Sequence, residues 1–168
     1  PHSIGAKKSF WIMNTDTTQM TSIEATLRYV GDHVYIWIQD EVNYREASVK
    51  TLGYTIDQDI VPTNREFFGT EWNPGVDGDE RFYVLYARGL GTTIAGYYSS
   101  SDEVHPDAHP YSNAHEMFLI SADNVRLEDK YILGTIAHEY QHMIHWHLDK
   151  NEETWVNEGF SMLAEQVN

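Results

Sequence analysis

The segment Leu133-Gly-Thr-Ile-Ala-His-Glu-Tyr-Gln-His-Met-Ile144 is the part of the chain that decides the fold. It belongs to the longest helical pattern in the sequence, from Leu127 to Leu148. Its apolar side chains recur three and four positions apart and form one arc, as in an amphipathic helix packed against a sheet. They are Leu133, Ile136, Ala137, Tyr140, Met143 and Ile144. The sequence therefore predicts a helix that buries this arc and presents His138 and His142 on a roughly opposite face.

Two imidazoles one turn apart on a helix can bind a single metal ion. His142 lies about 40° around the helix from His138, so nitrogen atoms of both rings can converge on Zn²⁺ at roughly 2.0–2.1 Å each. Glu139 lies about 100° around the same helix, where its carboxylate could take a proton from a water molecule at the metal. The alternative is a solvent-facing stripe of histidine and glutamate on a surface helix.

A catalytic zinc site needs a third protein ligand and an open position. The segment from Thr154 to Val167 is a second amphipathic pattern, with Glu158 opposite its apolar side chains. We predict Glu158 as the third ligand, because two helices that each bury one face can present ligands from the opposite face to one shared metal ion. His145 is a competing ligand, although three histidines on consecutive turns of one helix close poorly around a tetrahedral ion. Glu158 is alternatively an ordinary first-turn carboxylate favoured by the helix dipole.

The chain before this helix is dominated by strand patterns. Two of them flank the Gly31-Asp32 turn and predict a β-hairpin. The predicted strands cover residues 22–30, 33–39, 81–87, 92–98 and 116–121, and a further helix covers residues 43–59 and ends before Pro62. We therefore predict one domain of the α+β class, in which a mixed β-sheet packs against the helix of His138 and the following helix of Glu158.

The composition excludes several classes of function. The chain of 168 residues has 11 Lys and Arg against 26 Asp and Glu, a formal net charge of −15, which offers no basic cluster for nucleic acid or anionic lipid. Cysteine is absent, which excludes disulfides, thiolate metal sites and cysteine nucleophiles. The longest apolar stretches are far shorter than the roughly 18–20 residues of a membrane-spanning helix.

The metal-binding pattern resembles that of a known group of enzymes. His138, Glu139, His142 and the downstream Asn157-Glu158 are similar to the signature of the gluzincin metallopeptidases. Within that group, the amino-acid sequences of three segments resemble those of the hyicolysin-type bacterial secreted peptidases. These segments are residues 111–118, 137–144 and 154–161. The motif resemblance covers about a third of the chain, from Tyr111 to Val167.

This resemblance implies a zincin-like fold and a secreted, zinc-dependent endopeptidase in which the metal and Glu139 activate a water that attacks a peptide carbonyl. The partner it implies is a polypeptide substrate, with no nucleic acid and no membrane. In this group the substrate pairs with the edge strand that precedes the zinc helix, which we assign to residues 112–121, with Asn113 and Ala114 as substrate contacts. We expect residues 1–168 to form a single metallopeptidase catalytic domain that continues beyond Asn168 in the parent protein.

Two departures from the group concern the surroundings of the metal. Position 162 is Met, where thermolysin-like enzymes have a carboxylate that orients the first histidine, so the partner of His138 must come from elsewhere. Glu165 shares the helix face of Glu158 two turns later. The second departure concerns the His or Tyr that stabilises the oxyanion, which this group often supplies from beyond the second motif; we assign it to no residue.

Other interpretations remain open at this stage. Asp77-Gly78-Asp79 offers hard oxygen ligands for Ca²⁺, although solvated turn residues are the alternative. The alternative to an enzyme is a zinc-binding, non-catalytic fragment that serves as a binding or regulatory module. A third alternative is a structural protein with an accidental HExxH pattern, which would bind no stoichiometric zinc.

Overall fold

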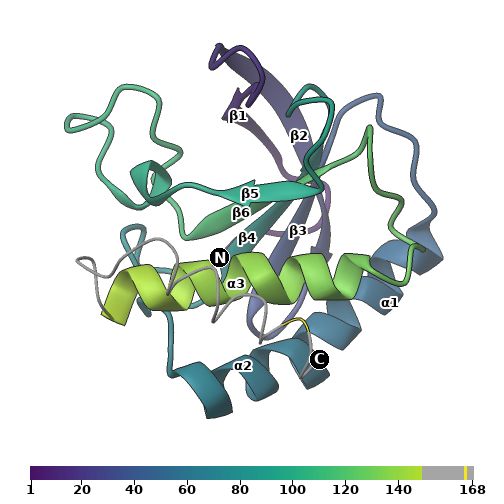
Figure 1. Ribbon diagram of the computed structural model, residues 1–168, viewed down its shortest axis with the longest axis vertical. Coiled ribbons are helices and arrows are strands. Elements are labelled where there is room, and N and C mark those ends of the chain that lie inside the picture. Colours follow the sequence, from purple (N-terminus) through teal and green to yellow (C-terminus); the bar gives the residue numbers. More distant parts are fainter. Residues whose placement is uncertain (149–164, 166–168) are drawn as a thin grey trace.

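A six-stranded mixed sheet is the centre of the computed structural model, which describes residues 1–148 and Glu165 (Figure 1). The strand order is β1-β2-β3-β4-β6-β5. Strands β1 to β3 pair antiparallel, β3, β4 and β6 pair parallel, and β5 pairs antiparallel with β6. In chain order, the strands and helices are β1 (Lys7–Met13), β2 (Met20–Val30), β3 (Val34–Gln39), α1 (Glu46–Thr55), a π-helical segment (Ile56–Ile60), α2 (Val61–Phe68), β4 (Phe82–Ala87), β5 (Gly96–Tyr98), a 3₁₀ turn (Ser100–Glu103), β6 (Met117–Ser121) and α3 (Ile132–Leu148).

All three helices pack on one face of the sheet, where α3 lies across the strands and α1 and α2 lie beneath it in the view of Figure 1. The contacting side chains on the sheet alternate along the strands, as in Val34, Ile36 and Ile38 of β3. On α3, five of the six apolar residues of the predicted arc are completely buried, and Leu133 is partly buried. The predicted amphipathic helix and its buried face are therefore confirmed.

The other face of the sheet is covered because the sheet curls, so that its strands enclose a second core. Its core is aromatic, with Phe10 of β1, Trp37 of β3 and Tyr83 of β4 in ring contact. Although β1 lies at one end of the strand order, the side chain of Asn113, near β6, accepts a hydrogen bond from Trp11 N and donates one to Trp11 O. These contacts bring the two ends of the sheet together, so the sheet curls around the aromatic core.

The central strands are buried on both faces because helices cover one side and the curled sheet covers the other. Every residue of β4 and β6 is buried. This explains their continuous apolar sequences, which are typical of interior parallel strands.

The structure confirms the hairpin of β2 and β3 and the mixed sheet, and it corrects three boundaries. The helical segment does not end before Pro62, because the π-helical residues lead directly into α2 and Pro62 stands at its start, where a missing N–H is tolerated. Helix α3 begins at Ile132 and not at Leu127. The expected strand at residues 92–98 is reduced to three residues.

Two further observations complete the comparison with the sequence. Strand β1 was not predicted, and the predicted helix of residues 154–167 lies outside the described residues except for Glu165. In the part of the chain that the structure describes, no helix combines the length and apolar character that crossing a membrane requires.

Candidate metal centre

The two histidines of α3 converge as the spacing predicts. Nε2 of His142 lies 3.0 Å from Nε2 of His138, and the two ring centroids are 4.7 Å apart. With metal–nitrogen distances of about 2.0–2.1 Å, two nitrogen atoms at this separation subtend an angle of roughly 95° at a shared ion, and a tetrahedral angle needs about 3.3 Å. A small opening of the pair is therefore enough for both nitrogens to bind one zinc ion.

A carboxylate fixes the orientation of the first histidine. Nδ1 of His138 forms a hydrogen bond of 2.7 Å with Oε1 of Glu165, which is half exposed. Because a carboxylate accepts this bond from a protonated Nδ1, it leaves the lone pair of His138 on Nε2, the atom that faces His142. A carboxylate behind a histidine ligand is the usual second contact of protein zinc sites, so the residues present suit zinc.

The sequence analysis did not predict the contact between Glu165 and His138, although the sequence contains an indication of it. The helical period places Glu165 on the face of Glu158, and the Met at position 162 required another partner for His138. The contact itself joins two side chains 27 residues apart in the sequence, which periodicity does not predict.

Glu139, the predicted general base, is a buried residue, 8% exposed. Its neighbours in the sequence hold α3 in place. The side chain of Asn64 on α2 donates a buried hydrogen bond of 3.0 Å to the carbonyl oxygen of Ala137. Tyr140 donates its hydroxyl proton to Oε2 of Glu71, and Arg65 of α2 forms hydrogen bonds with both of these side chains. Helix α3 is therefore anchored on both sides of the residue that would act as the base.

The Arg65–Glu71 pair carries a charge into the interior. Burial alone raises the pKa of the Glu71 carboxyl, but the hydrogen bonds from Arg65 and Tyr140, together with the charge of Arg65, outweigh it and lower this pKa. Burial beside Glu71 raises the pKa of the Tyr140 hydroxyl. Glu71 is thus ionised and fully partnered, which makes it part of the support of α3 and not a free acid.

The described residues do not supply a third ligand. Among residues 1–148 and Glu165, no group of three or more His, Asp or Glu side chains is placed to hold a metal ion. His145, the competing ligand, therefore does not complete a site with His138 and His142 in this part of the chain. Glu158 lies outside the described residues, and its role as a ligand stays a prediction.

The prediction that residues 112–121 form the edge strand of the sheet is wrong. Strand β6 (Met117–Ser121) lies between β4 and β5, and β5 is the outermost strand at that end of the sheet. Asn113 and Ala114 lie in the loop before β6, where Asn113 N donates to Oδ1 of Asp102 and Ala114 N donates to Oγ of Ser112. Their role as substrate contacts stays a prediction, but its original reason, a place on the edge strand, does not hold.

The carboxylates proposed for Ca²⁺ have protein partners. Asp77 forms a hydrogen bond of 2.6 Å with Nδ1 of the buried His115, and Asp79 accepts a proton from the hydroxyl of Tyr35 at 3.0 Å. Neither is a freely solvated turn residue, and the calcium site receives no support from the described residues.

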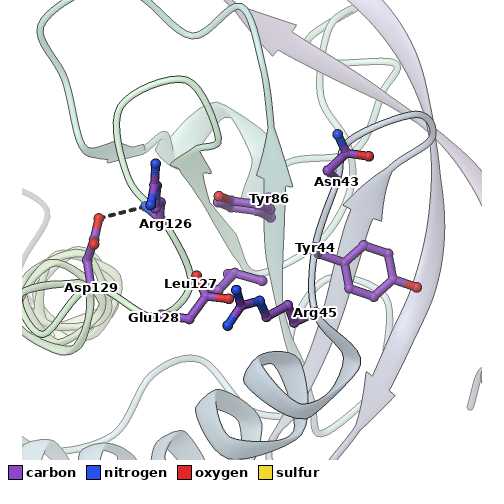
Figure 2. Close-up of a pocket in the computed structure, with 8 residues that line it drawn as sticks. All are labelled: Asn43, Tyr44, Arg45, Tyr86, Arg126, Leu127, Glu128 and Asp129. Carbon is purple, nitrogen blue, oxygen red and sulfur yellow. Dashed lines mark hydrogen bonds between the residues drawn. The ribbon is translucent and has the colours of Figure 1, made fainter.

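A separate cavity of about 420 Å³ opens near the start of α3 (Figure 2). Arg45, at the start of α1, and Arg126, in the segment before α3, both line it. Asp129 accepts a hydrogen bond of 2.8 Å from the backbone N–H of Arg126 and holds this segment in a turn. None of His138, Glu139 and His142 lines the cavity, so it is distinct from the histidine pair.

The chain is similar to a known metalloprotease. It is 28% identical over 178 residues to the neutral metalloprotease ShpI of Staphylococcus hyicus, in an alignment that covers 95% of this chain and 40% of that protein. The chain thus spans about 40% of the length of this relative. No protein-family model matches the chain. The similarity supports a relationship with metal-dependent proteases.

Proposed function

We propose that the protein is a zinc-dependent endopeptidase of the gluzincin type. The observation that carries the proposal is the convergence of His138 Nε2 and His142 Nε2 to 3.0 Å, with Glu165 holding the far side of the His138 ring. A surface stripe of histidines has no need of this arrangement. The similarity to a metalloprotease over 95% of the chain points to the same chemistry.

Three side chains would hold the metal in this proposal: His138, His142 and Glu158. Two imidazoles and one carboxylate, with one position left open, form a donor set typical of catalytic zinc. Zinc, when bound, polarises the substrate carbonyl and makes the attacking water more acidic.

Glu139 is the general base. Its carboxylate follows His138 directly, so it lies beside the histidine pair and not between its nitrogen atoms. It takes a proton from the attacking water and later delivers it to the departing amine nitrogen, which leaves the carboxylate unchanged after each turnover. Its low exposure keeps competing water away from this proton transfer.

The substrate is an extended polypeptide that adds to the free edge of β5. This strand is outermost in the sheet and packs against α3. Main-chain hydrogen bonds to such an edge are independent of the side chains of the guest peptide, which suits an enzyme acting on many sequences. Secretion fits such an enzyme, and neither nucleic acid nor a membrane has a role in this proposal.

Metal content and casein hydrolysis, measured together for the wild type and Glu139→Gln, test the proposal. The wild type should contain one zinc per chain and hydrolyse casein. Glu139→Gln should keep its zinc and lose about 10²–10⁴-fold in kcat, because only the base is removed. His147→Ala changes an exposed histidine of the same helix and serves as the control, with zinc and activity unchanged. A wild type without stoichiometric zinc would refute the proposal.

The same experiment separates the proposed enzyme from a zinc-binding, non-catalytic module. That alternative draws on the fact that the chain spans 40% of its relative. A module predicts stoichiometric zinc in the wild type and in Glu139→Gln, with hydrolysis in neither.

A further inference from the structure

A pocket between β1 and the loop that follows β5 has no part in the chemistry described so far. It has a volume of about 210 Å³ and is enclosed by β1, β2, β5 and the long loop that follows β5. Trp11, Tyr97 and Tyr111 supply aromatic surface, and Asp102 and His109 supply the ionisable groups. No lysine or arginine of the described residues lines it.

The aromatic walls are held by specific contacts. The rings of Trp11 and Tyr111 meet edge to face, with centroids 5.0 Å apart and planes at 79°. The hydroxyl of Tyr97 accepts a hydrogen bond of 2.9 Å from the backbone N–H of Met13, which fixes the third ring. Because the faces of aromatic rings attract cations, such walls favour a positively charged guest over a neutral one of the same shape.

Asp102 supplies a carboxyl group that no lysine, arginine or histidine of the described residues neutralises. The residue is 5% exposed. Its Oδ1 atom accepts hydrogen bonds from N and Nδ2 of Asn113, at 3.0 and 2.9 Å, whereas Oδ2 has no hydrogen bond or ion pair with any described residue. Burial raises the pKa of this carboxyl to about 7, even though the two bonds from Asn113 lower it. A cation inside the pocket would supply the missing partner and favour the ionised carboxylate.

The place of the pocket relates it to the free edge of β5. Tyr97 faces the aromatic core and the pocket, while Tyr98 faces the helices. A peptide added to this edge alternates in the same way, so every second side chain of the guest points to the side of the pocket. A volume of about 210 Å³ suits one long side chain and is too small for a folded segment.

We propose that this pocket binds the basic side chain, lysine or arginine, of a polypeptide substrate paired with β5, with Asp102 as the counter-charge and Trp11, Tyr97 and Tyr111 as the walls. The substrate part of this inference rests on the proposed protease function. The cation site itself rests on the buried carboxylate and the aromatic rings alone.

The first arm of the test measures binding without catalysis. Butylammonium and butylguanidinium, which reproduce the ends of lysine and arginine, are titrated into the protein while indole fluorescence and the NMR signals of Trp11 are followed, with pentan-1-ol as the neutral probe. Saturable binding of at least one cation, none of pentan-1-ol, and a tenfold or greater loss of affinity in Asp102→Asn are expected. Tyr111→Leu, at an exposed wall of the pocket, should also weaken binding, and Asp107→Asn, an exposed acid of the same loop, should not.

The second arm measures cleavage of matched peptides that carry lysine, norleucine or glutamate at one position at a time. At one position, kcat/KM should be at least tenfold higher for lysine than for norleucine, and Asp102→Asn should abolish this preference.

The two arms distinguish the possible failures. If neither butylammonium nor butylguanidinium binds saturably, the cation site is refuted. Cleavage without a preference for basic residues refutes the substrate assignment. Amine binding without cleavage of any peptide refutes the protease function, and with it the substrate assignment, but leaves the cation site in place.

Discussion

Two buried carboxylates from different parts of the fold, Glu71 and Asp102, differ in what surrounds them. Glu71, next to α3, is 3% exposed, and Asp102, in the loop after β5, is 5% exposed. The pKa of Glu71 is lowered, because Arg65 and Tyr140 outweigh the effect of burial. The pKa of Asp102 is raised to about 7, because burial outweighs the two hydrogen bonds from Asn113. Similar burial therefore leads to opposite shifts, and the presence of an internal cation decides the sign.

This difference distinguishes carboxylates that support the structure from a carboxylate that can bind a ligand. The carboxylates near α3 have internal partners, Arg65 and Tyr140 for Glu71 and His138 for Glu165. They hold α3 and its first histidine in place. The carboxylate of Asp102 has only Asn113 as a hydrogen-bond partner among the described residues, and it lines a pocket. A charge without an internal counter-charge costs stability, and such a cost is expected where an outside ligand completes the site.

The largest expected effect comes from removing the internal cation. Arg65→Met leaves the Glu71 charge buried without its counter-charge, so the free energy of unfolding at pH 7 should fall by about 3–5 kcal/mol. Because the pKa of Glu71 is lowered on folding, its contribution is present above its ordinary pKa of 4.5 and lost as the pH falls below it. Urea denaturation should therefore show a smaller penalty at acid pH.

Two further variants sharpen this test. Arg65→Met combined with Glu71→Leu removes both charges and should recover most of the loss. Arg88→Met breaks an exposed pair with Asp123 at 3.9 Å and should change stability by less than about 1 kcal/mol. A penalty for Arg65→Met that is equal at all pH values would contradict an ionised Glu71.

Asp102→Asn should act in the opposite direction. The pKa of Asp102 is raised on folding from 3.8 to about 7, so the folded state binds the extra proton and loses stability as the pH rises through this range. The asparagine lacks this penalty and keeps an oxygen for Asn113. Urea denaturation should show no difference from the wild type near pH 4 and a gain at pH 7 with an upper bound of about 4 kcal/mol. An equal effect at both pH values would show that Asp102 is not titrating.

Tyr140→Phe tests the neutral partner of Glu71. The variant removes one hydrogen bond to a buried carboxylate and should lower the free energy of unfolding by about 1.5–3 kcal/mol. Thermal denaturation should show this loss without a change in zinc content, because Tyr140 belongs to the buried side of α3. Tyr131→Phe, which removes a hydroxyl from an exposed side chain directly before α3, should change stability by less than about 0.5 kcal/mol. Equal effects of the two variants would contradict a stabilising role for the hydrogen bond between Tyr140 and Glu71.

The smallest expected effect concerns Glu165. Glu165→Gln keeps the shape of the side chain but weakens its hold on Nδ1 of His138, so the Kd for zinc should rise about 10–100-fold. Competition with a chromophoric chelator measures this change. Glu66→Gln, on the exposed surface of α2, is the matched control. If both variants bind zinc like the wild type, Glu165 does not position the histidine.

The elements of the fold followed from local patterns, and their arrangement did not. Apolar spacing was sufficient for α3, and the Gly31-Asp32 turn was sufficient for the β2–β3 hairpin. Strand β1 was missed because its first half, Lys-Lys-Ser, lacks apolar residues and its pairing with β2 supplies what the sequence does not show. Residues 112–121 were placed at the edge because chain order does not indicate that β5 folds back outside β6.

The histidine pair could be predicted because both residues lie on one helix, where spacing determines geometry. The carboxylates that contact α3 could not be predicted, because Glu71 and Glu165 are distant in sequence from their partners Tyr140 and His138. The pocket of Asp102 was also missed, because Trp11 and Tyr111 are 100 residues apart and meet only when the sheet curls. The role of Glu158 also depends on a contact between residues distant in sequence, and it stays a prediction.

Zinc K-edge X-ray absorption on the protein, loaded with one equivalent of zinc, tests the central claim most directly. We predict two imidazole nitrogens at about 2.0–2.1 Å with oxygen donors completing the shell, and the loss of one imidazole in His142→Ala. A spectrum without imidazole scattering, or a protein that retains no zinc after dialysis, would contradict the account.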